Sequence, residues 1–349
     1  MKQHEREYFI SQIRSGITNV TKNDISVRVL NPTIEQEWES CLVFEKSYTD
    51  SYRNDVMSQD EMLEWMIEHG MWSQEQDGKA EGLKKDIDRL KVEIFNARNN
   101  RGLADNIRLY LRAGEEQLIE LLSQKFEYNH QTREGMASIE KDQWLIECCT
   151  FKDGKLFNFV DISVPYILSS YKESQLDHSD IRELARTEPW RSLWMTRKDS
   201  ECNLFLNTKD RTQNIDQRQI VIWSQMYDNI QESLDCPTQD VIEDDDMLDG
   251  WFIIQGKKRD KERAEGEFEQ STKSDKIKNS DEVFVMTGSD RDVSRIDSMN
   301  DIGSQMVKKQ REALIKRKGG DSVSQGEFSD EKLKLQRSSN QQYKSKFGG

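Results

Sequence analysis

Two long segments with apolar residues at helical spacing constrain the fold of this chain most strongly. In the first, apolar side chains recur at steps of four, three and four residues, at Leu83, Ile87, Leu90 and Ile94. In the second, they recur at Ile107, Leu111, Leu118, Leu122 and Phe126. Residues 99–102 (Asn-Asn-Arg-Gly) separate the two segments. The pattern predicts an antiparallel helical hairpin over 73–130 that packs against the rest of the body.

Local signals predict further helices on both sides of this hairpin. Asn31-Pro32 is expected to begin a helix, because the first helical residue has no use for the N–H that proline lacks. Apolar and polar residues then follow at helical spacing, at Trp38, Cys41, Leu42 and Glu45. Ser58 and Glu61 form a capping box, and Gly70 can end that helix. Later helical patterns cover 164–171, 179–185, 217–230 and 239–264.

Two stretches predict β-structure. Residues 24–30 (DISVRVL) alternate and are β-branched, which is typical of a short strand. Asp153-Gly154 lies between the apolar stretches 144–151 and 155–163, and such a dipeptide favours a tight hairpin turn. The fold class we expect is mainly α, a helical body with a long helical hairpin and a small β-hairpin, followed by a disordered C-terminal tail.

The composition changes near residue 255. Residues 256–349 contain no Trp, Pro or Cys, and a segment this polar cannot bury enough apolar area to offset chain entropy. We therefore divide the chain into an N-terminal α region with a short strand (1–72), the helical hairpin (73–130), a mainly α domain with the β-hairpin and a Trp cluster (131–255), and a disordered charged tail (256–349).

Charge is unevenly spread along the chain. The net charge is −14, but residues 256–349 hold 21 Lys and Arg against 17 Asp and Glu, a balance of +4, which leaves −18 for residues 1–255. An acidic body repels nucleic acid and anionic membranes. Two amphipathic pieces of the tail, 280–288 and 303–318, could fold on a partner. The second carries six basic residues at Lys308, Lys309, Arg311, Lys316, Arg317 and Lys318.

No stretch approaches the ~20 apolar residues needed to span a bilayer, and the first ten residues lack the apolar run of a signal peptide. We therefore expect a cytoplasmic protein with no membrane partner. The five cysteines form no CxxC pair, so free thiols are expected at Cys41, Cys148, Cys149, Cys202 and Cys236. Cys148 and Cys149 lie in an apolar strand context, which predicts buried rather than reactive thiols.

An acidic cluster is the most prominent candidate for chemistry, at Glu243, Asp244, Asp245, Asp246 and Asp249. Converging carboxylates can bind a divalent metal, which would permit a hydrolase or nuclease. The spacing does not match an EF-hand loop, and carboxylates near a helix N-terminus also complement its dipole. We favour the helix-start interpretation, and the metal alternative stays open.

No familiar catalytic or nucleotide-binding motif occurs elsewhere. The four histidines (His4, His69, His130 and His178) are scattered, and no phosphate-binding glycine loop or H-E-x-x-H sequence is present. We therefore expect no catalytic residue, no metal site, no cofactor and no enzymatic activity.

Aromatic residues gather in the second half of the body. Trp190 and Trp194 lie one helical turn apart, as do Trp223 and Tyr227, with Trp251 and Phe252 following. The interpretation we favour is an aromatic core of a small helical domain. The sharper alternative is a partner-binding patch, because Trp and Tyr dominate interface hot spots. Its candidate residues are Trp190, Trp194, Trp223, Tyr227, Trp251 and Phe252.

Several stretches resemble a known family. EPWRSLW, IVIWSQMYDNI and CPTQDVIEDDDMLDGWFIIQGKKR within 185–259, together with EWMIEHGMWS and LKKDIDRLKVEIFN within 64–96, resemble virion-assembly proteins of large tailed bacteriophages, in particular tail assembly chaperone-like proteins. The resemblance implies a non-enzymatic, mostly helical protein that holds another protein, such as a tape-measure chain, until it assembles. It implies other virion or assembly proteins as partners, and the host cell cytoplasm or the virion as location.

The expected function is thus a bacteriophage assembly or minor structural protein that acts through protein–protein interaction. The alternative is a regulatory protein that contacts nucleic acid weakly through residues 303–318, since clustered Lys and Arg can neutralise phosphates.

Overall fold

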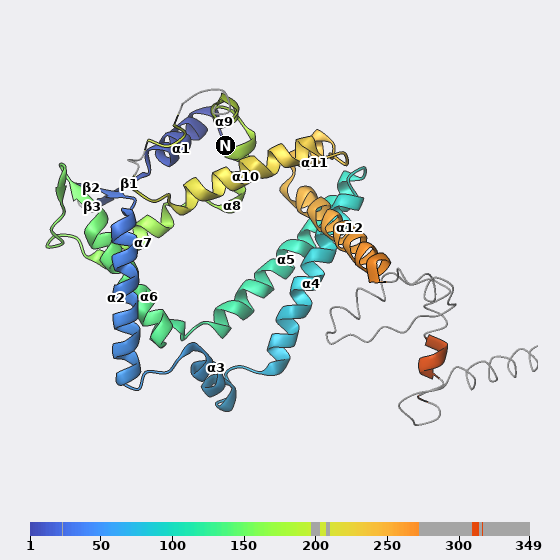
Figure 1. Ribbon diagram of the computed structural model, residues 1–349, viewed down its shortest axis with the longest axis horizontal. Helices are drawn as coiled ribbons and strands as arrows, with labels where there is room; N and C mark the ends of the chain where they lie inside the picture. The colour runs from blue at the N-terminus through green and yellow to red at the C-terminus, as the bar shows by residue number, and fades with distance from the viewer. Residues whose placement is uncertain (23, 197–202, 207–209, 272–308, 314–315, 317–349) are drawn as a thin grey trace, which may run out of the picture. The chain divides into compact units, whose positions relative to one another are not determined.

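The structure is a computed structural model, and it describes residues 1–22, 24–196, 203–206, 210–271, 309–313 and 316. The chain divides into two compact units, Met1–Ile253 and Ile254–Gly349. The first unit contains nearly all of the described elements (Figure 1). The fold class is mainly α with a small antiparallel sheet, as the sequence predicted.

Up to residue 271, the described residues form twelve α-helices and one short 3-10 helix. The helices before the sheet's second hairpin are α1 (Gln3–Ser15), α2 (Ile34–Arg53), α3 (Gln59–Glu68), α4 (Gln74–Asn96), α5 (Arg101–Lys125), η1 (Asn129–Gln131) and α6 (Arg133–Cys149). Those after it are α7 (Val164–Glu173), α8 (His178–Arg186), α9 (Trp190–Thr196), α10 (Ile215–Glu232), α11 (Gln239–Glu243) and α12 (Asp245–Ser271).

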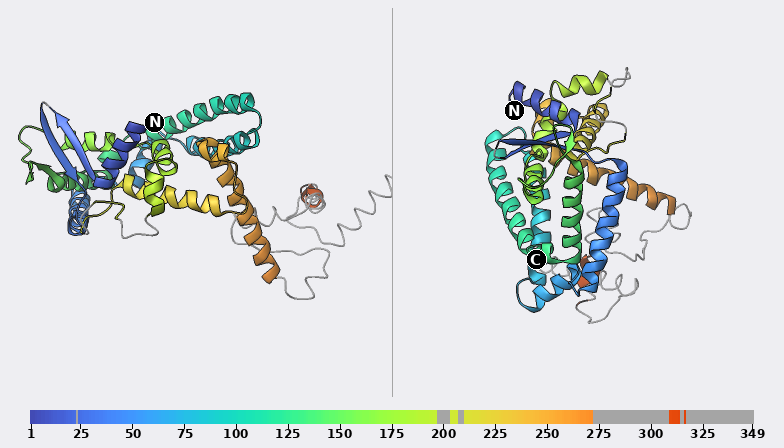
Figure 2. Two further views of the ribbon diagram at one scale, coloured as in Figure 1. Left: turned by 90° about the horizontal axis from the view of Figure 1, so that it is seen from above. Right: turned by 90° about the vertical axis from the view of Figure 1, so that its left-hand side faces the viewer.

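Four antiparallel strands form one sheet in the order β1-β2-β3-β4, with bounds β1 (Ile17–Lys22), β2 (Ile25–Leu30), β3 (Thr150–Lys152) and β4 (Lys155–Leu156). Strands β1 and β2 run side by side in Figure 2, with Ile17 opposite Leu30. One face of the sheet packs on α6 and α7 through Val27, Val29, Ile146 and Ile167. The sequence analysis predicted β2 but missed β1.

The predicted β-hairpin is present, but it is shorter than expected. Asp153 and Gly154 form its turn with φ of 52° and 78°, the left-handed pair that a tight hairpin requires. Residues 144–149 are helical rather than extended, because they complete α6. The predicted strand context of Cys148 and Cys149 is therefore wrong. Apolar residues at 145, 146 and 149 fit one face of a helix as well as a strand.

The long helical hairpin is confirmed. Helices α4 and α5 pack along each other through Ile87, Ile94, Ala104 and Leu111, which are buried. Ser73 caps α4 by accepting from the Gln76 N–H. The hairpin also packs against the rest of the first unit, where Met247 contacts the Ile94 cluster.

Three predicted boundaries are wrong. Helix α2 begins at Ile34, not at Pro32, because Thr33 and Gln36 form the capping box. The helix expected over 239–264 is broken at Asp244, whose extended backbone separates α11 from α12. Helix α12 continues to Ser271, so a disordered tail does not begin at residue 256. Lys258 and Glu262 lie at i, i+4 spacing, which stabilises an exposed helix.

The rest of the predicted tail lies outside the described residues, apart from 309–313 and 316. The predicted boundary at 255/256 lies next to the border between the two units at 253/254. Inside the first unit, Ile10 and Ile13 share one core with residues of α8 to α12. Packing therefore joins the predicted regions 1–72 and 131–255 into one body.

Gly250 tests how closely α12 approaches α4. A Cβ atom at this position would lie 2.2 Å from the Lys91 carbonyl oxygen. Gly250→Ala must therefore displace one helix, and we expect the free energy of unfolding to fall by about 2 kcal/mol in chemical denaturation.

The matched control is Gly256→Ala in the same helix, where a Cβ meets nothing within 4 Å. This change should raise stability by up to about 1 kcal/mol, as alanine favours helix. Equal effects of the two substitutions would contradict the close approach.

Candidate protein-binding surface

The acidic cluster begins helix α12, as the favoured interpretation predicted. Asp244 accepts from the Met247 N–H at 3.1 Å, so it acts as the N-cap, and Asp245 and Asp246 lie in the first turn. Each carboxylate that follows Glu243 faces cations of other helices. Asp244 pairs with Arg108, Asp245 with Arg182 and Arg186, Asp246 with Arg108 and Arg112, and Asp249 with Lys91 and Arg182.

This ion-pair cluster ties three parts of the first unit together. Lys91 and Arg108 belong to the helical hairpin, and Arg182 to α8, where its side chain is 4% exposed. The Lys91 Nζ and Arg182 Nη1 atoms both lie 2.8 Å from Asp249. The carboxylates are thus engaged by basic side chains, and the described residues contain no group of three His, Cys, Asp or Glu that could hold a metal.

The predicted aromatic residues are brought together in the core of helices α1 and α8 to α12. Trp190 and Trp194 are 0% and 1% exposed and stack at 6.5 Å between ring centroids. Trp223, Tyr227 and Trp251 are buried, and Phe252 is half-buried beside Trp223 and Trp251. This arrangement is the aromatic core. Partner binding by these side chains stays a prediction, and none of them presents an open face in this conformation.

Three buried indole N–H groups of this core have acceptors. Trp190 Nε1 donates to Ser224 Oγ at 2.8 Å and Trp194 Nε1 to Asp228 at 2.7 Å. Trp223 Nε1 donates to Nε2 of the exposed His178 at 3.2 Å. A satisfied donor removes the penalty of burying an indole, so the cluster is stable without a partner.

The cysteines that the structure describes carry free thiols, and Cys202 lies outside the described residues. Burial raises the pKa of Cys149 to about 12 and raises the pKa of Cys148 above its ordinary value. Both thiols are therefore protonated at neutral pH, and a protonated thiol is a poor nucleophile.

His69 and His130 contact backbone carbonyl groups of their own helical turns, those of Trp65 and Glu127.

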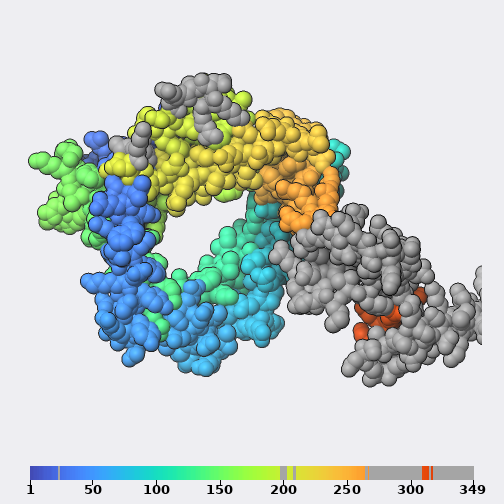
Figure 3. Space-filling model, viewed as in Figure 1, coloured from blue at the N-terminus to red at the C-terminus, as the bar shows by residue number. Residues whose placement is uncertain are grey.

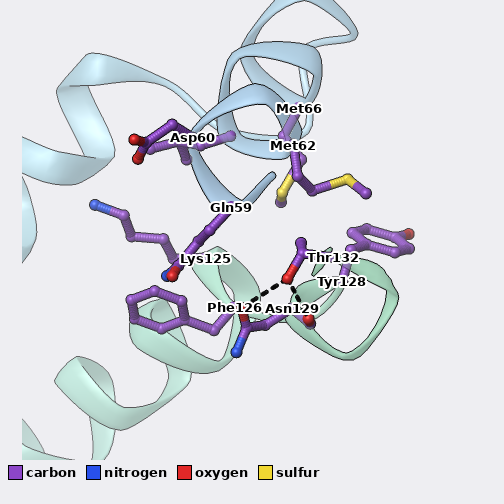
Figure 4. Close-up of a pocket in the computed structure, with 10 residues that line it drawn as sticks. Gln59, Asp60, Met62, Met66, Lys125, Phe126, Tyr128, Asn129 and Thr132 are labelled. Carbon is purple, nitrogen blue, oxygen red and sulfur yellow. Dashed lines mark hydrogen bonds between the residues drawn. The ribbon is translucent and has the colours of Figure 1, made fainter. Parts of the chain in front are cut away.

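A small cavity of about 220 Å³ lies between α3 and the segment that joins α5 to α6 (Figure 4). Its apolar lining includes Met62, Met66 and Phe126. Two polar side chains of its lining have partners within the protein. Lys125 Nζ lies 2.6 Å from Asp77, and Thr132 donates to the Asn129 carbonyl at 2.7 Å. The cavity is smaller than the roughly 300–1,000 Å³ of small-molecule sites, so it can take a side chain rather than a substrate.

Helix α2 combines buried serines with exposed large apolar side chains. Its fully buried residues are all serines, Ser40, Ser47 and Ser51, and the helix packs on α6. Several of its large apolar side chains point outward instead. Ile34 is 64% exposed, Trp38 65%, Leu42 46% and Tyr52 62%. Val43, Phe44 and Tyr48 of the same helix are half-buried. The exposed residues nevertheless depart from the ordinary arrangement, in which a helix buries its apolar stripe.

The exposed residues form one stripe along the helix. At 3.6 residues per turn, Ile34, Trp38, Leu42 and Tyr52 fall within about 80° of arc, and the stripe is about 27 Å long. The exposed Cys41 lies at the edge of this arc. We call these five residues the outer face of α2: Ile34, Trp38, Cys41, Leu42 and Tyr52. In the space-filling view α2, in blue, lies at the molecular surface (Figure 3).

Both ends of α2 are held in place. At the start, Gln36 Nε2 donates to the Cys148 carbonyl at 3.3 Å, and Arg211 donates to the Asn31 carbonyl. At the end, the Arg133 guanidinium lies 4.9 Å from the centre of the Tyr52 ring and its Nε donates to the Val56 carbonyl. The outer face is therefore a rigid platform, because the helix beneath it is anchored at both ends.

Sequence reasoning placed Trp38, Cys41 and Leu42 on a helix but did not identify their exposure. The missed signal is the spacing of Ser40, Ser47 and Ser51, which marks an inner face of small residues on the opposite side. Three of the six basic residues proposed for nucleic-acid contact, Lys308, Arg317 and Lys318, lie outside the described residues, and that alternative stays a prediction.

Comparisons with protein-family models, with curated proteins and with solved structures gave no match for this chain. None of the described helices is both long and apolar enough to cross a bilayer. The case for a function therefore rests on the geometry of the chain itself.

Asp249→Asn tests the ion-pair cluster. Burial raises the Asp249 pKa, but hydrogen bonds from Lys91 and the charge of Arg182 outweigh it, so the pKa lies below the ordinary 3.8. A carboxylate whose pKa is lower in the folded than in the unfolded state stabilises the protein above about pH 4. This stabilisation is lost as the pH falls through the pKa of the folded state. We expect the variant to lose about 2 kcal/mol of unfolding free energy at pH 7 and progressively less below pH 4, in urea titrations.

Asp86→Asn is the control, because Asp86 and Arg89 form an exposed pair. Removing such a pair should change stability by less than about 0.5 kcal/mol. A loss for Asp249→Asn that does not shrink toward low pH would show that its charge is not the cause.

Ser224→Ala tests the aromatic core. It leaves the Trp190 N–H, in a side chain that is 0% exposed, without its acceptor. We expect the unfolding free energy to fall by about 2 kcal/mol. Both variants are measured in a thermal or urea melt. The control Ser11→Ala, at an exposed position of α1, should leave the unfolding free energy unchanged or raise it slightly. If both variants behave alike, the hydrogen bond contributes nothing.

Proposed function

We propose that the protein acts by binding another protein through the outer face of α2, without catalysis. The observation that carries the proposal is that the fully buried residues of an anchored helix are all serines, while Trp38, Ile34, Leu42 and Tyr52 are exposed. Exposed apolar side chains of this size on one face are typical of interaction sites, and Trp and Tyr are among the residues most enriched at binding hot spots.

The groups that would otherwise suggest chemistry support this proposal. The acidic cluster is engaged in ion pairs, such as Asp249 with Arg182, and burial raises the pKa of Cys149 to about 12. The cavity next to Met66 has paired polar groups and a small volume. These features serve the folded structure, whereas the outer face of α2 contributes little to the internal packing.

The finer proposal is a role in virion assembly. The sequence resemblance to tail assembly chaperone-like proteins of tailed bacteriophages supports it, since such proteins work by holding a partner. On this proposal, the partners are other virion or assembly proteins and the protein acts in the cytoplasm of the infected cell.

Site-specific photo-crosslinking tests the binding function. Trp38 is replaced by benzoylphenylalanine in the full chain, within the cells that naturally make the protein, and crosslinked products are identified by mass spectrometry. Because Trp38 is 65% exposed on the outer face, we expect crosslinks to one defined protein.

The matched control is the same replacement at Tyr110, an aromatic residue that is 71% exposed on α5 and outside this face. It should give no such product. Position 38 yielding no crosslinked protein above the level at position 110 would refute the proposal.

A further inference from the structure

We propose that the occupant of the outer face of α2 is a basic amphipathic helix of a partner protein. This inference rests on the proposed function and specifies its partner. It starts from the charges that surround the apolar stripe.

The charged residues of α2 are strongly unbalanced. Five are acidic and two basic, at Glu35, Glu37, Glu39, Glu45, Asp50, Lys46 and Arg53. Arg53 pairs with Asp50 at 3.5 Å. Glu35, Glu39 and Glu45 are exposed and form no ion pair with any described residue. Lys46 is also exposed and lies on the same side without an ion pair among the described residues. The unpaired charges on the exposed side of α2 therefore leave an excess of two negative charges.

These carboxylates are placed where a partner's side chains would reach them. At 100° per residue, Glu45 projects within the stripe itself, between the directions of Ile34 and Trp38. Glu35 and Glu39 project along one flank of the stripe. Lys and Arg side chains suit such positions, because their aliphatic stems cover apolar surface while their charged ends reach carboxylates.

The shape of the stripe favours a helix as the occupant. It is straight and about 27 Å long, the length of about five helical turns. A helix presents apolar residues at i, i+4 and i+7 to such a ridge, as in helix-in-groove recognition. A peptide that binds as an added β-strand would instead need the free edge of a sheet, and α2 offers none.

Other occupants fit the charges poorly. A second copy would bring together two helices that each carry an excess of negative charge, in chains of net charge −14, and like charges oppose association. Nucleic acid and anionic membranes are repelled for the same reason. A cationic helix gains attraction at long range and keeps its apolar contacts at short range.

Two synthetic peptides of about eighteen residues provide the probe. Both carry the same apolar helical stripe of Leu, one flanked by Lys and the other by Glu. Their binding to the full chain is measured by fluorescence anisotropy. We expect the Lys peptide to bind at least about tenfold more tightly than the Glu peptide, and to weaken as salt rises from about 50 to about 500 mM.

Substitutions in α2 test whether the Lys peptide binds to this helix. Glu35→Gln/Glu39→Gln/Glu45→Gln should weaken the Lys peptide about tenfold and remove most of its salt dependence. The control Glu116→Gln/Glu120→Gln/Glu140→Gln removes the same charge from exposed positions of α5 and α6 and should bind like the unchanged protein. Trp38→Ala should weaken binding with little effect on the melting temperature, since this side chain is 65% exposed.

Equal binding of the two peptides, or equal loss in both triple variants, would overturn the inference. A dimer in sedimentation velocity that Trp38→Ala dissolves would overturn it in favour of a second copy. None of these results excludes a crosslink from position 38 to another protein. The proposed function therefore does not fail together with this inference. Absence of that crosslink removes the proposed function itself.

Discussion

Close packing of α2 on α6 is the constraint on which the account of this protein depends. Ser40, Ser47 and Ser51 are the buried side of α2, and their small size lets the two helices approach. With that side occupied, the bulky residues of the outer face have no place inside. Trp38 and its neighbours are therefore held at the surface by packing on the opposite face. Their exposure is a property of the fold and not of a loose segment.

In the rest of the first unit, the acidic cluster and the aromatic residues stabilise the folded structure. Asp249 joins Lys91 of the hairpin to Arg182 of α8, and Gly250 lets α12 approach the Lys91 backbone. Trp190 and its hydrogen bond to Ser224 close the aromatic core. Both clusters stabilise the frame that carries α2. These groups therefore act within the folded structure, whereas the outer face of α2 is exposed to solvent.

Elements with strong local signals could be predicted from the sequence. The hairpin follows from the spacing of Leu83 to Ile94, and the capping box at Ser58 and the turn at Asp153-Gly154 follow from their own side chains. The end of α6 and the break at Asp244 could not, because they depend on partners distant in the sequence. Strand β1 was missed although its partner β2 follows it directly in the chain. Exposure of Trp38 also depends on α6, which is about a hundred residues away.

The most direct test of the central claim is hydroxyl-radical footprinting of the free, full-length protein, with Trp38 and Trp190 compared in one sample. The structure gives them exposures of 65% and 0%. The account predicts fast oxidation of Trp38 and strong protection of Trp190. If Trp38 is protected as well as Trp190, α2 does not present its apolar side to solvent, and the binding surface described above does not exist.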